Sequence, residues 1–226
     1  MSAPSPTPSA IRPPGRRDTV PILDGARIAI LVAHEFEDIE LLYPIMRLSE
    51  EGASVVVGTL PLSTPAHFHT RPWFADKPVT GRFGSTVPIL VLAEGRRYTH
   101  RPIPDLRGDD FDAIIFPGGF SPDYLRTDPT TLDLAAAAYR AGKVVAAICH
   151  GPQVLISVDR RRGTDIVRGR RVTGYAATED DLRNAGGDYE DVPAVRVGNV
   201  VTGRCPDDLP EFCQEVVAAL ASVPVR

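Results

Sequence analysis

The chain alternates between short, almost uninterrupted apolar runs and longer segments in which apolar residues recur at helical spacing. The apolar runs at 27–33, 111–116 and 143–148 predict strands that are buried on both faces of a sheet. Segment 38–51 shows the helical spacing and is followed by a further strand at 53–59. Strand, helix and strand within about 35 residues form a βαβ unit.

The second half of the chain continues the same alternation. Helices are predicted at 129–140, from 151 onward, at 178–184 and at 209–220, a short strand at 172–174, and a β-hairpin at 194–202 with Gly198-Asn199 as its two-residue loop. Strands that alternate with helices imply an α/β fold with a doubly wound, mostly parallel sheet and helices on both faces.

Two segments depart from this pattern. Residues 1–22 are rich in Pro and Ser and predict a disordered tail, which leaves 23–226 as a single domain. Within that domain, residues 61–110 contain frequent Pro and Gly and one predicted strand at 87–92. So long an excursion in a compact α/β domain is usually a lid, an interface arm or a hairpin.

Composition removes several classes of function. The formal net charge of −4 gives no basic surplus for nucleic acid or an anionic membrane. No apolar run reaches the roughly 18 residues of a transmembrane helix, and the tail lacks the apolar segment of a secretory signal, so we expect a cytoplasmic protein. Three cysteines give no disulfide framework, and their spacing does not suggest zinc.

The candidate chemistry follows the predicted strands, because sites in open parallel sheets lie beyond the carboxyl ends of the strands. Cys149 follows the strand at 143–148, between the small residues Ala147 and Gly151, as a sharp nucleophile turn requires. The start of the next helix would favour the thiolate. The alternative interpretation is a buried core cysteine.

Other groups could assist this cysteine. His150 is a candidate general base or acid, and Asp123 is a candidate to orient it, although each could instead cap a helix. The backbone at Gly118-Gly119 could approach a substrate closely and, with the N–H of His150, stabilise an oxyanion. Glu37 could hydrogen-bond the sulfur or relay a proton. Three other acidic residues lie near Glu37 in the sequence, so this acidic cluster alone does not identify a function: Glu35, Asp38 and Glu40.

Taken together, these motifs resemble the PfpI-type intracellular proteases, of the ThiJ/PfpI branch of the class I glutamine amidotransferase-like superfamily. The resemblance runs from about 27 to 220 apart from the middle excursion. The matching segments are 35–38, 116–119, 147–153, 168–170, 172–175, 180–181, 184–186 and 206–210.

The resemblance implies a flavodoxin-like three-layer sandwich that assembles as a homodimer or higher homo-oligomer and has no obligatory cofactor. It implies Cys149 as nucleophile, His150 as its partner and Glu37 as the carboxyl that contacts the sulfur. Asp123 stands where the archaeal proteases carry Glu, and in the family that acid can come from a neighbouring subunit. Tyr175 matches a tyrosine near the family's pocket.

Three features lie outside the family pattern or its core. His67 and His69 form an H-x-H pair, but a surface or pocket-rim segment is the favoured interpretation and we expect no metal site. A short insertion at 160–164 could reshape the pocket or the subunit contacts. Cys205 lies in a segment that resembles a family loop, and we favour a surface thiol there.

Three functions remain open. The first is an enzyme that adds the Cys149 thiolate to a small carbonyl compound, as in glyoxalase III-like or deglycase-like chemistry. The second is hydrolysis of amides in short peptides. The third is a non-enzymatic redox sensor or holdase with an oxidisable Cys149. A glutamine amidotransferase role is disfavoured, because no feature of the sequence indicates a synthetase partner.

Overall fold

A computed structural model describes residues 21–60 and 77–222. Most of the predicted N-terminal tail and the His67/His69 pair lie outside the described residues. No helix within the described ranges is long and apolar enough to cross a membrane.

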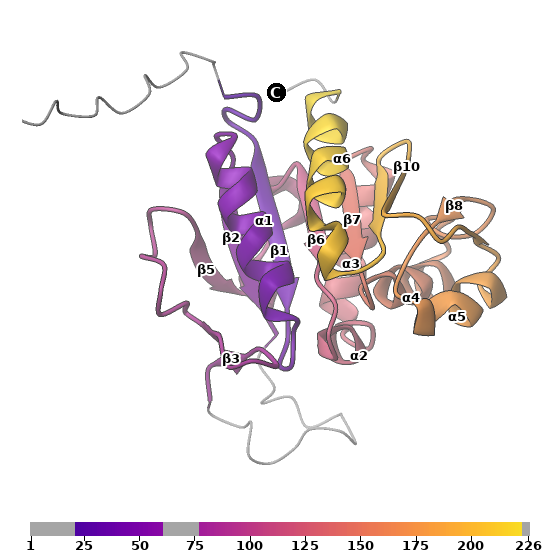
Figure 1. Cartoon of the computed structure of the whole chain (residues 1–226), viewed down its shortest axis with the longest axis horizontal. Helices are drawn as coiled ribbons and strands as arrows, with labels where there is room; N and C mark the ends of the chain where they lie inside the picture. Colours follow the sequence, from indigo (N-terminus) through magenta and orange to yellow (C-terminus); the bar gives the residue numbers. More distant parts are fainter. Residues whose placement is uncertain (1–20, 61–76, 223–226) are drawn as a thin grey trace, which may run out of the picture.

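A seven-stranded sheet forms the centre of the molecule (Figure 1). Every neighbouring pair is parallel except β10 with β11, which form the predicted hairpin. This confirms the doubly wound, mostly parallel architecture. In spatial order the strands are β10 (Ala194–Val197), β11 (Val200–Gly203), β7 (Val144–Ile148), β6 (Ala113–Phe116), β1 (Arg27–Val32), β2 (Ser54–Thr59) and β5 (Thr99–Pro102).

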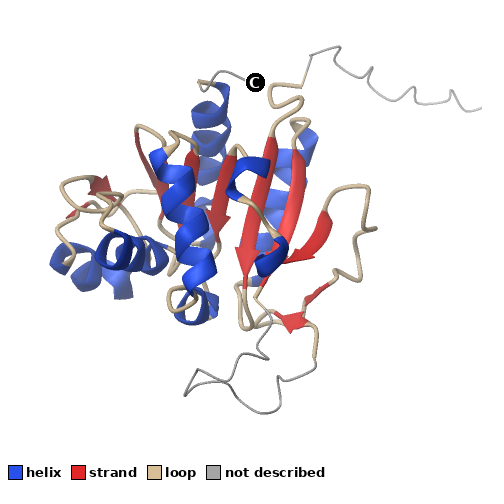
Figure 2. Ribbon diagram, turned by 180° about the vertical axis from the view of Figure 1, so that it is seen from behind, coloured by secondary structure: helices blue, strands red, loops and turns tan. Residues whose placement is uncertain are grey.

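Helices cover both faces of the sheet (Figures 1 and 2). One layer holds α1 (Asp38–Glu50) and α6 (Leu209–Ala221), which pack against each other. The other holds α3 (Pro129–Arg140) and α4 (Pro152–Arg162). The shorter helices are α2 (Ser121–Leu125) and α5 (Glu179–Asn184), with 3-10 turns η2 (Ile103–Asp105), η3 (Gly108–Asp110), η4 (Ala176–Thr178) and η5 (Pro206–Asp208).

Burial on both faces explains the continuous apolar runs. In β1, Ile28 and Ile30 pack into the apolar cluster under α1 and α6, while Ala29 and Leu31 pack into the cluster under α3 and α4. All four side chains are almost fully buried. Because successive strand residues point to opposite faces, a strand between two helix layers needs apolar side chains at every position.

The excursion at 61–110 differs from its prediction. The expected strand at 87–92 is wrong: only Thr86–Val87 is extended, as β4, pairing with β3 (Val79–Thr80) in a small hairpin. Leu90 and Val91 are 89% and 81% exposed, so this apolar run has no sheet to enter. The edge strand β5 was missed because its sequence is polar and mostly exposed.

Two smaller differences concern the packing of α1 and a peripheral sheet. Ile39 and Met46 fit the apolar helical spacing of segment 38–51, yet they are 46% and 43% exposed. The buried face of α1 instead includes Leu41, Ile45 and Leu48. The short strand predicted at 172–174 is β8 (Arg171–Val172), which pairs with β9 (Asp188–Tyr189).

Candidate active site

Cys149 lies in the tight turn between β7 and α4. Its φ of +62° falls in the left-handed region that non-glycine residues seldom adopt, a form of backbone strain that is often found at functional sites. The Gly151 N–H donates to the Ile148 carbonyl at 2.8 Å and closes the turn. A Cβ at Gly151 would lie 2.2 Å from the Phe116 carbonyl oxygen, so only glycine fits there.

A glycine turn after β6 faces the cysteine. Gly118 lies so close that a Cβ there would be 2.8 Å from the Cys149 Cβ and 3.0 Å from its sulfur. The neighbouring Gly119 has a φ of +70° and pairs with Phe36 in an isolated β-bridge. The turn after β6 is thereby fixed to the turn after β1.

Two backbone donors reach the sulfur of Cys149. The N–H groups of Gly119 and His150 lie close enough to the sulfur to lower its pKa. Donors so placed are also suited to negative charge that develops on a substrate oxygen beside the sulfur. The oxyanion role of these groups stays a prediction.

Glu40 is the carboxyl group that contacts the thiol. Its side chain is fully buried, and its Oε2 accepts a hydrogen bond from the Gly118 N–H at 2.6 Å. Its Oε1 is buried without a hydrogen bond of regular geometry, so the interaction with Cys149 is a looser one. Burial raises the pKa of Glu40 to about 7, against the lowering effects of the Gly118 and Cys149 hydrogen bonds.

Glu37, which the sequence analysis assigned to this contact, lies further out. Its Oε2 forms an ion pair with Arg82 at 3.2 Å. Burial raises the pKa of Glu37, and Arg82 opposes the shift. The structure thus places Glu40, rather than Glu37, on the sulfur. The helical spacing could have identified Glu40. It is four residues before Pro44 and eight before Leu48, and residues at this spacing share the buried face of α1.

The thiol itself is held in its protonated form more strongly than expected. Burial raises the pKa of Cys149, and the charge and hydrogen bond of Glu40 raise it further. These effects outweigh the two backbone donors and differ from the expectation of a thiolate favoured by the helix start. With both pKa values raised, the buried thiol and carboxyl retain at least one proton at neutral pH.

His150 stands beside this pair with Tyr175 against its ring. The two rings stack with centroids 5.1 Å apart and planes inclined by 26°. The Tyr175 N–H donates to the Cys149 carbonyl at 2.9 Å, which fixes the tyrosine at the site while 43% of it stays exposed. Burial lowers the pKa of His150, so its imidazole is neutral at physiological pH.

Asp123 lies on α2, within electrostatic range of His150. Its charge raises the pKa of the imidazole, partly offsetting the effect of burial. No hydrogen bond joins Asp123 to His150 among the residues that the structure describes. The aspartate therefore acts on the imidazole through its charge within one chain, and its orienting role stays a prediction.

Arg82 is a site residue that the sequence analysis missed. The β3–β4 hairpin places it: the Glu35 N–H donates to the Thr80 carbonyl at 2.7 Å and the Arg82 N–H to the Phe36 carbonyl at 2.9 Å. The guanidinium lies 5.3 Å from the centre of the Phe120 ring. No periodic signal marks this residue, because its position depends on a hairpin formed within the excursion.

The remaining cysteines and possible metal ligands take no part in this geometry. The Cys205 thiol donates to Oδ2 of Asp208 at 3.0 Å, and Cys213 is buried in α6. Within the described ranges, no three His, Cys, Asp or Glu side chains gather as a metal site would require.

Comparisons with known proteins show which family the chain belongs to. The sequence profile of the DJ-1/PfpI family matches residues 26–219. YraA of Bacillus subtilis, named as a proposed cysteine protease, is 41% identical over 189 residues, covering 84% of this chain and 95% of that protein. Deglycase PfpI of Pyrococcus furiosus is 34% identical over 194 residues, covering 86% and 99%.

Solved structures show the same fold. A two-domain Anabaena variabilis protein with DJ-1/ThiJ/PfpI-like and ferritin-like domains has a TM-score of 0.68 and 32% identity, covering 88% of this chain and 50% of that chain. Drosophila melanogaster DJ-1beta also has a TM-score of 0.68, at 22% identity, covering 88% and 91%. With the elbow cysteine, the facing glycine turn and a profile match across the sheet, the chain belongs to the DJ-1/PfpI family.

Proposed function

We propose that the chain is a cysteine-dependent enzyme that acts on small aldehydes or dicarbonyl compounds, with Cys149 as nucleophile and Glu40 as the group that exchanges protons. The observation that carries the proposal is the buried contact between this thiol and a carboxyl group whose pKa is raised to about 7. A group with a pKa near the working pH both accepts and returns protons efficiently.

With methylglyoxal as the substrate, every bond and proton of the proposed reaction is accounted for. The sulfur bonds to the aldehyde carbon, and the thiol proton passes through Glu40 to the carbonyl oxygen, which gives a hemithioacetal. Glu40 then takes the proton from that carbon and returns it to the neighbouring carbon, while the hydroxyl proton moves to the ketone oxygen. Water cleaves the resulting lactoyl thioester, the sulfur regains its proton, and lactate leaves.

The backbone supports the step in which charge develops. Oxygen anions form next to the sulfur during addition and during thioester hydrolysis. The N–H groups of Gly119 and His150 lie beside the sulfur, which supports a role for them in stabilising this charge. Fixed donors in a buried site stabilise such charge without reorganisation.

Amide hydrolysis is the second candidate, supported by the same two donors and by the neutral imidazole of His150. The leaving amine must gain a proton, which requires an oriented acid beside it. The group in contact with the thiol is instead Glu40, and addition to an aldehyde has no leaving group to protonate. A redox sensor or holdase is the third candidate, and it predicts no turnover at all.

The assembly and location expected from the resemblance stay proposals. We expect a homodimer or higher homo-oligomer in the cytoplasm that takes a small-molecule or short-peptide substrate. The exposed apolar side chains Ile39, Met46, Leu90 and Val91 supply surface for such contacts. Light scattering on the full chain measures the mass directly.

The function is tested by incubating the purified protein with methylglyoxal or with a panel of fluorogenic peptide amides. Lactate formation that Cys149→Ser abolishes and the matched thiol control Cys205→Ser preserves supports carbonyl chemistry. Amide cleavage with no lactate, in the same protein, would transfer the function to the second candidate. Absence of both activities, with an intact reactive thiol, would favour the third.

A further inference from the structure

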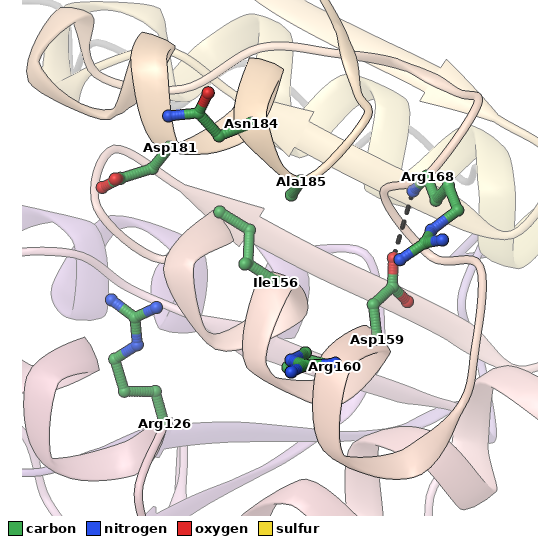
Figure 3. Close-up of a pocket in the computed structure, with 8 residues that line it drawn as sticks. All are labelled: Arg126, Ile156, Asp159, Arg160, Arg168, Asp181, Asn184 and Ala185. Carbon is green, nitrogen blue, oxygen red and sulfur yellow. Dashed lines mark hydrogen bonds between the residues drawn. The ribbon is translucent and has the colours of Figure 1, made fainter.

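A cleft lies apart from Cys149, on later turns of α4. It has a volume of about 420 Å³ and opens between α4 and α5 (Figure 3). The residues that line it come from four segments of the chain: Arg126, Ile156, Asp159, Arg160, Arg168, Asp181, Asn184 and Ala185.

Three guanidinium groups give the cleft a cationic wall. Arg126 ends α2, Arg160 lies near the end of α4, and Arg168 follows α4 in the loop toward β8. Within residues 21–60 and 77–222, no carboxylate forms an ion pair with any of these three. Arg162, which lies on the same helix as Arg160 but outside the cleft lining, is in contrast paired with Asp133 at 2.5 Å.

Asp159, the acidic residue among these arginines, is held by neutral hydrogen-bond donors rather than by their guanidinium groups. Both carboxylate oxygens of Asp159 accept backbone N–H groups: those of Ile166 at 2.7 Å, Val167 at 2.9 Å and Arg168 at 3.1 Å. The Thr164 hydroxyl also donates to it, at 2.6 Å. The Asp159 carboxylate thus folds the loop, and the three guanidinium groups, set against the carboxylates of Asp159 and Asp181, leave the cleft lining with a net charge of +1.

The opposite wall is polar and comes from α5. Asp181 and Asn184 line it, and Figure 3 shows the Arg126 side chain directed across the cleft toward the α5 side. Ile156 and Ala185 supply a small apolar surface between the two walls. Carboxylate and amide oxygens accept hydrogen bonds from hydroxyl groups, whereas guanidinium groups match phosphate oxygens.

We propose that the cleft between α4 and α5 binds a small phosphorylated polyhydroxy compound, with its phosphate on the arginine wall and its hydroxyl groups on the α5 wall. The volume is that of an ordinary small-molecule site. Cys149 does not line the cleft, so binding there does not need the thiol. The inference therefore stands or falls separately from the proposed function.

Calorimetry with ribose 5-phosphate as the probe tests this assignment in the full chain. Binding is expected in both the wild type and Cys149→Ser. The double variant Arg160→Gln/Arg168→Gln should weaken it about tenfold or more, because two charged donors to phosphate are removed. Arg161→Gln is the matched control, since this exposed neighbour on α4 lies outside the cleft lining, and it should leave the affinity within about twofold.

Further binding measurements test the two walls of the cleft separately. Ribose without its phosphate should not bind measurably, and inorganic phosphate should bind more weakly than ribose 5-phosphate. Failure of ribose 5-phosphate to bind, or equal weakening by Arg161→Gln and the double variant, would overturn the site. Equal affinity for inorganic phosphate and ribose 5-phosphate would overturn the polyhydroxy assignment.

Discussion

The Oε2 atom of Glu40 accepts a 2.6 Å hydrogen bond from the backbone N–H of Gly118, the residue that also lies against the Cys149 sulfur. One glycine thus fixes the acid from α1 and the thiol from the β7–α4 turn relative to each other. The proton-exchanging pair is built by backbone placement rather than by adjacent residues in the sequence.

Glu40→Gln should lower the pKa of the Cys149 thiol. The carboxylate raises that pKa through its charge and hydrogen bond, and a neutral amide removes the charge. The midpoint of the pH profile for iodoacetamide alkylation should therefore move to lower pH. Glu37→Gln, which removes a charge that is paired with Arg82, should move it much less. A midpoint that stays or rises in Glu40→Gln contradicts the contact.

The same carboxyl should make stability depend on pH. Its pKa rises from 4.5 to about 7 on folding, so the folded chain binds more protons in that window. The stabilisation is full below about pH 4.5 and is lost as the pH rises through about 7, on the order of 3 kcal/mol. Urea unfolding at pH 5 and pH 8 should show this loss in the wild type and a smaller loss in Glu40→Gln. Equal losses of stability in both proteins would show that Glu40 is not the source of this pH dependence.

Gly118→Ala should damage the site. The added Cβ would lie 2.8 Å from the Cys149 Cβ and 2.8 Å from the His150 nitrogen, so the elbow must shift. We expect a stability cost of about 1–3 kcal/mol and loss of thiol alkylation rate. Gly108→Ala is the control, because its nearest neighbour would be at 3.7 Å. Comparable effects of the two substitutions would show that the close approach is unimportant.

Asp123→Asn should lower the pKa of His150. Both Asp123 and Asp181 raise that pKa by stabilising the imidazolium, and Asp123 has the larger effect. NMR titration of the His150 ring should show a downward shift in Asp123→Asn and a smaller one in Asp181→Asn. If the order is reversed, or if Asp123→Asn leaves the pKa unchanged, Asp123 does not act on this imidazole within one chain.

Asp38→Ala should loosen the hairpin that carries Arg82. The two Asp38 carboxylate oxygens accept the N–H groups of Phe83 at 2.8 Å and Ser85 at 2.7 Å. Hydrogen bonds to a charged group contribute about 1.5–3 kcal/mol each, so a cost of about 2–4 kcal/mol is expected in urea unfolding. Glu50→Ala, on the same helix but exposed, should cost less than about 1 kcal/mol. A similarly small cost for both substitutions would show that Asp38 does not hold the hairpin in place.

The sequence predicted the sheet well because its strands are buried on both sides. Apolar runs such as 143–148 have no other stable location, and glycine at 151 marks the tight turn. The apolar run at 87–92 gave a wrong prediction because an apolar segment predicts a strand whether or not a neighbouring strand pairs with it. Leu90 and Val91 lie outside any sheet, and only the tertiary fold decides this.

The sequence indicated where the candidate site lies, but it did not indicate which acidic residue contacts the Cys149 thiol. Glu35, Glu37 and Glu40 follow one strand, and the sequence motif alone does not say which one turns inward. The positive φ of Glu35 and the start of α1 at Asp38 set the register that buries Glu40. Arg82 could not be found, because its place depends on hydrogen bonds between a distant hairpin and the turn after β1.

The most direct test of the central claim is lactate formation from methylglyoxal by Glu40→Gln and Glu37→Gln, measured beside the wild type with thiol content matched. We expect Glu40→Gln to lower kcat about a hundredfold or more, since the substitution removes the group that moves the protons. Glu37→Gln should retain most of the rate. Full activity in Glu40→Gln, or loss in Glu37→Gln alone, would contradict the account.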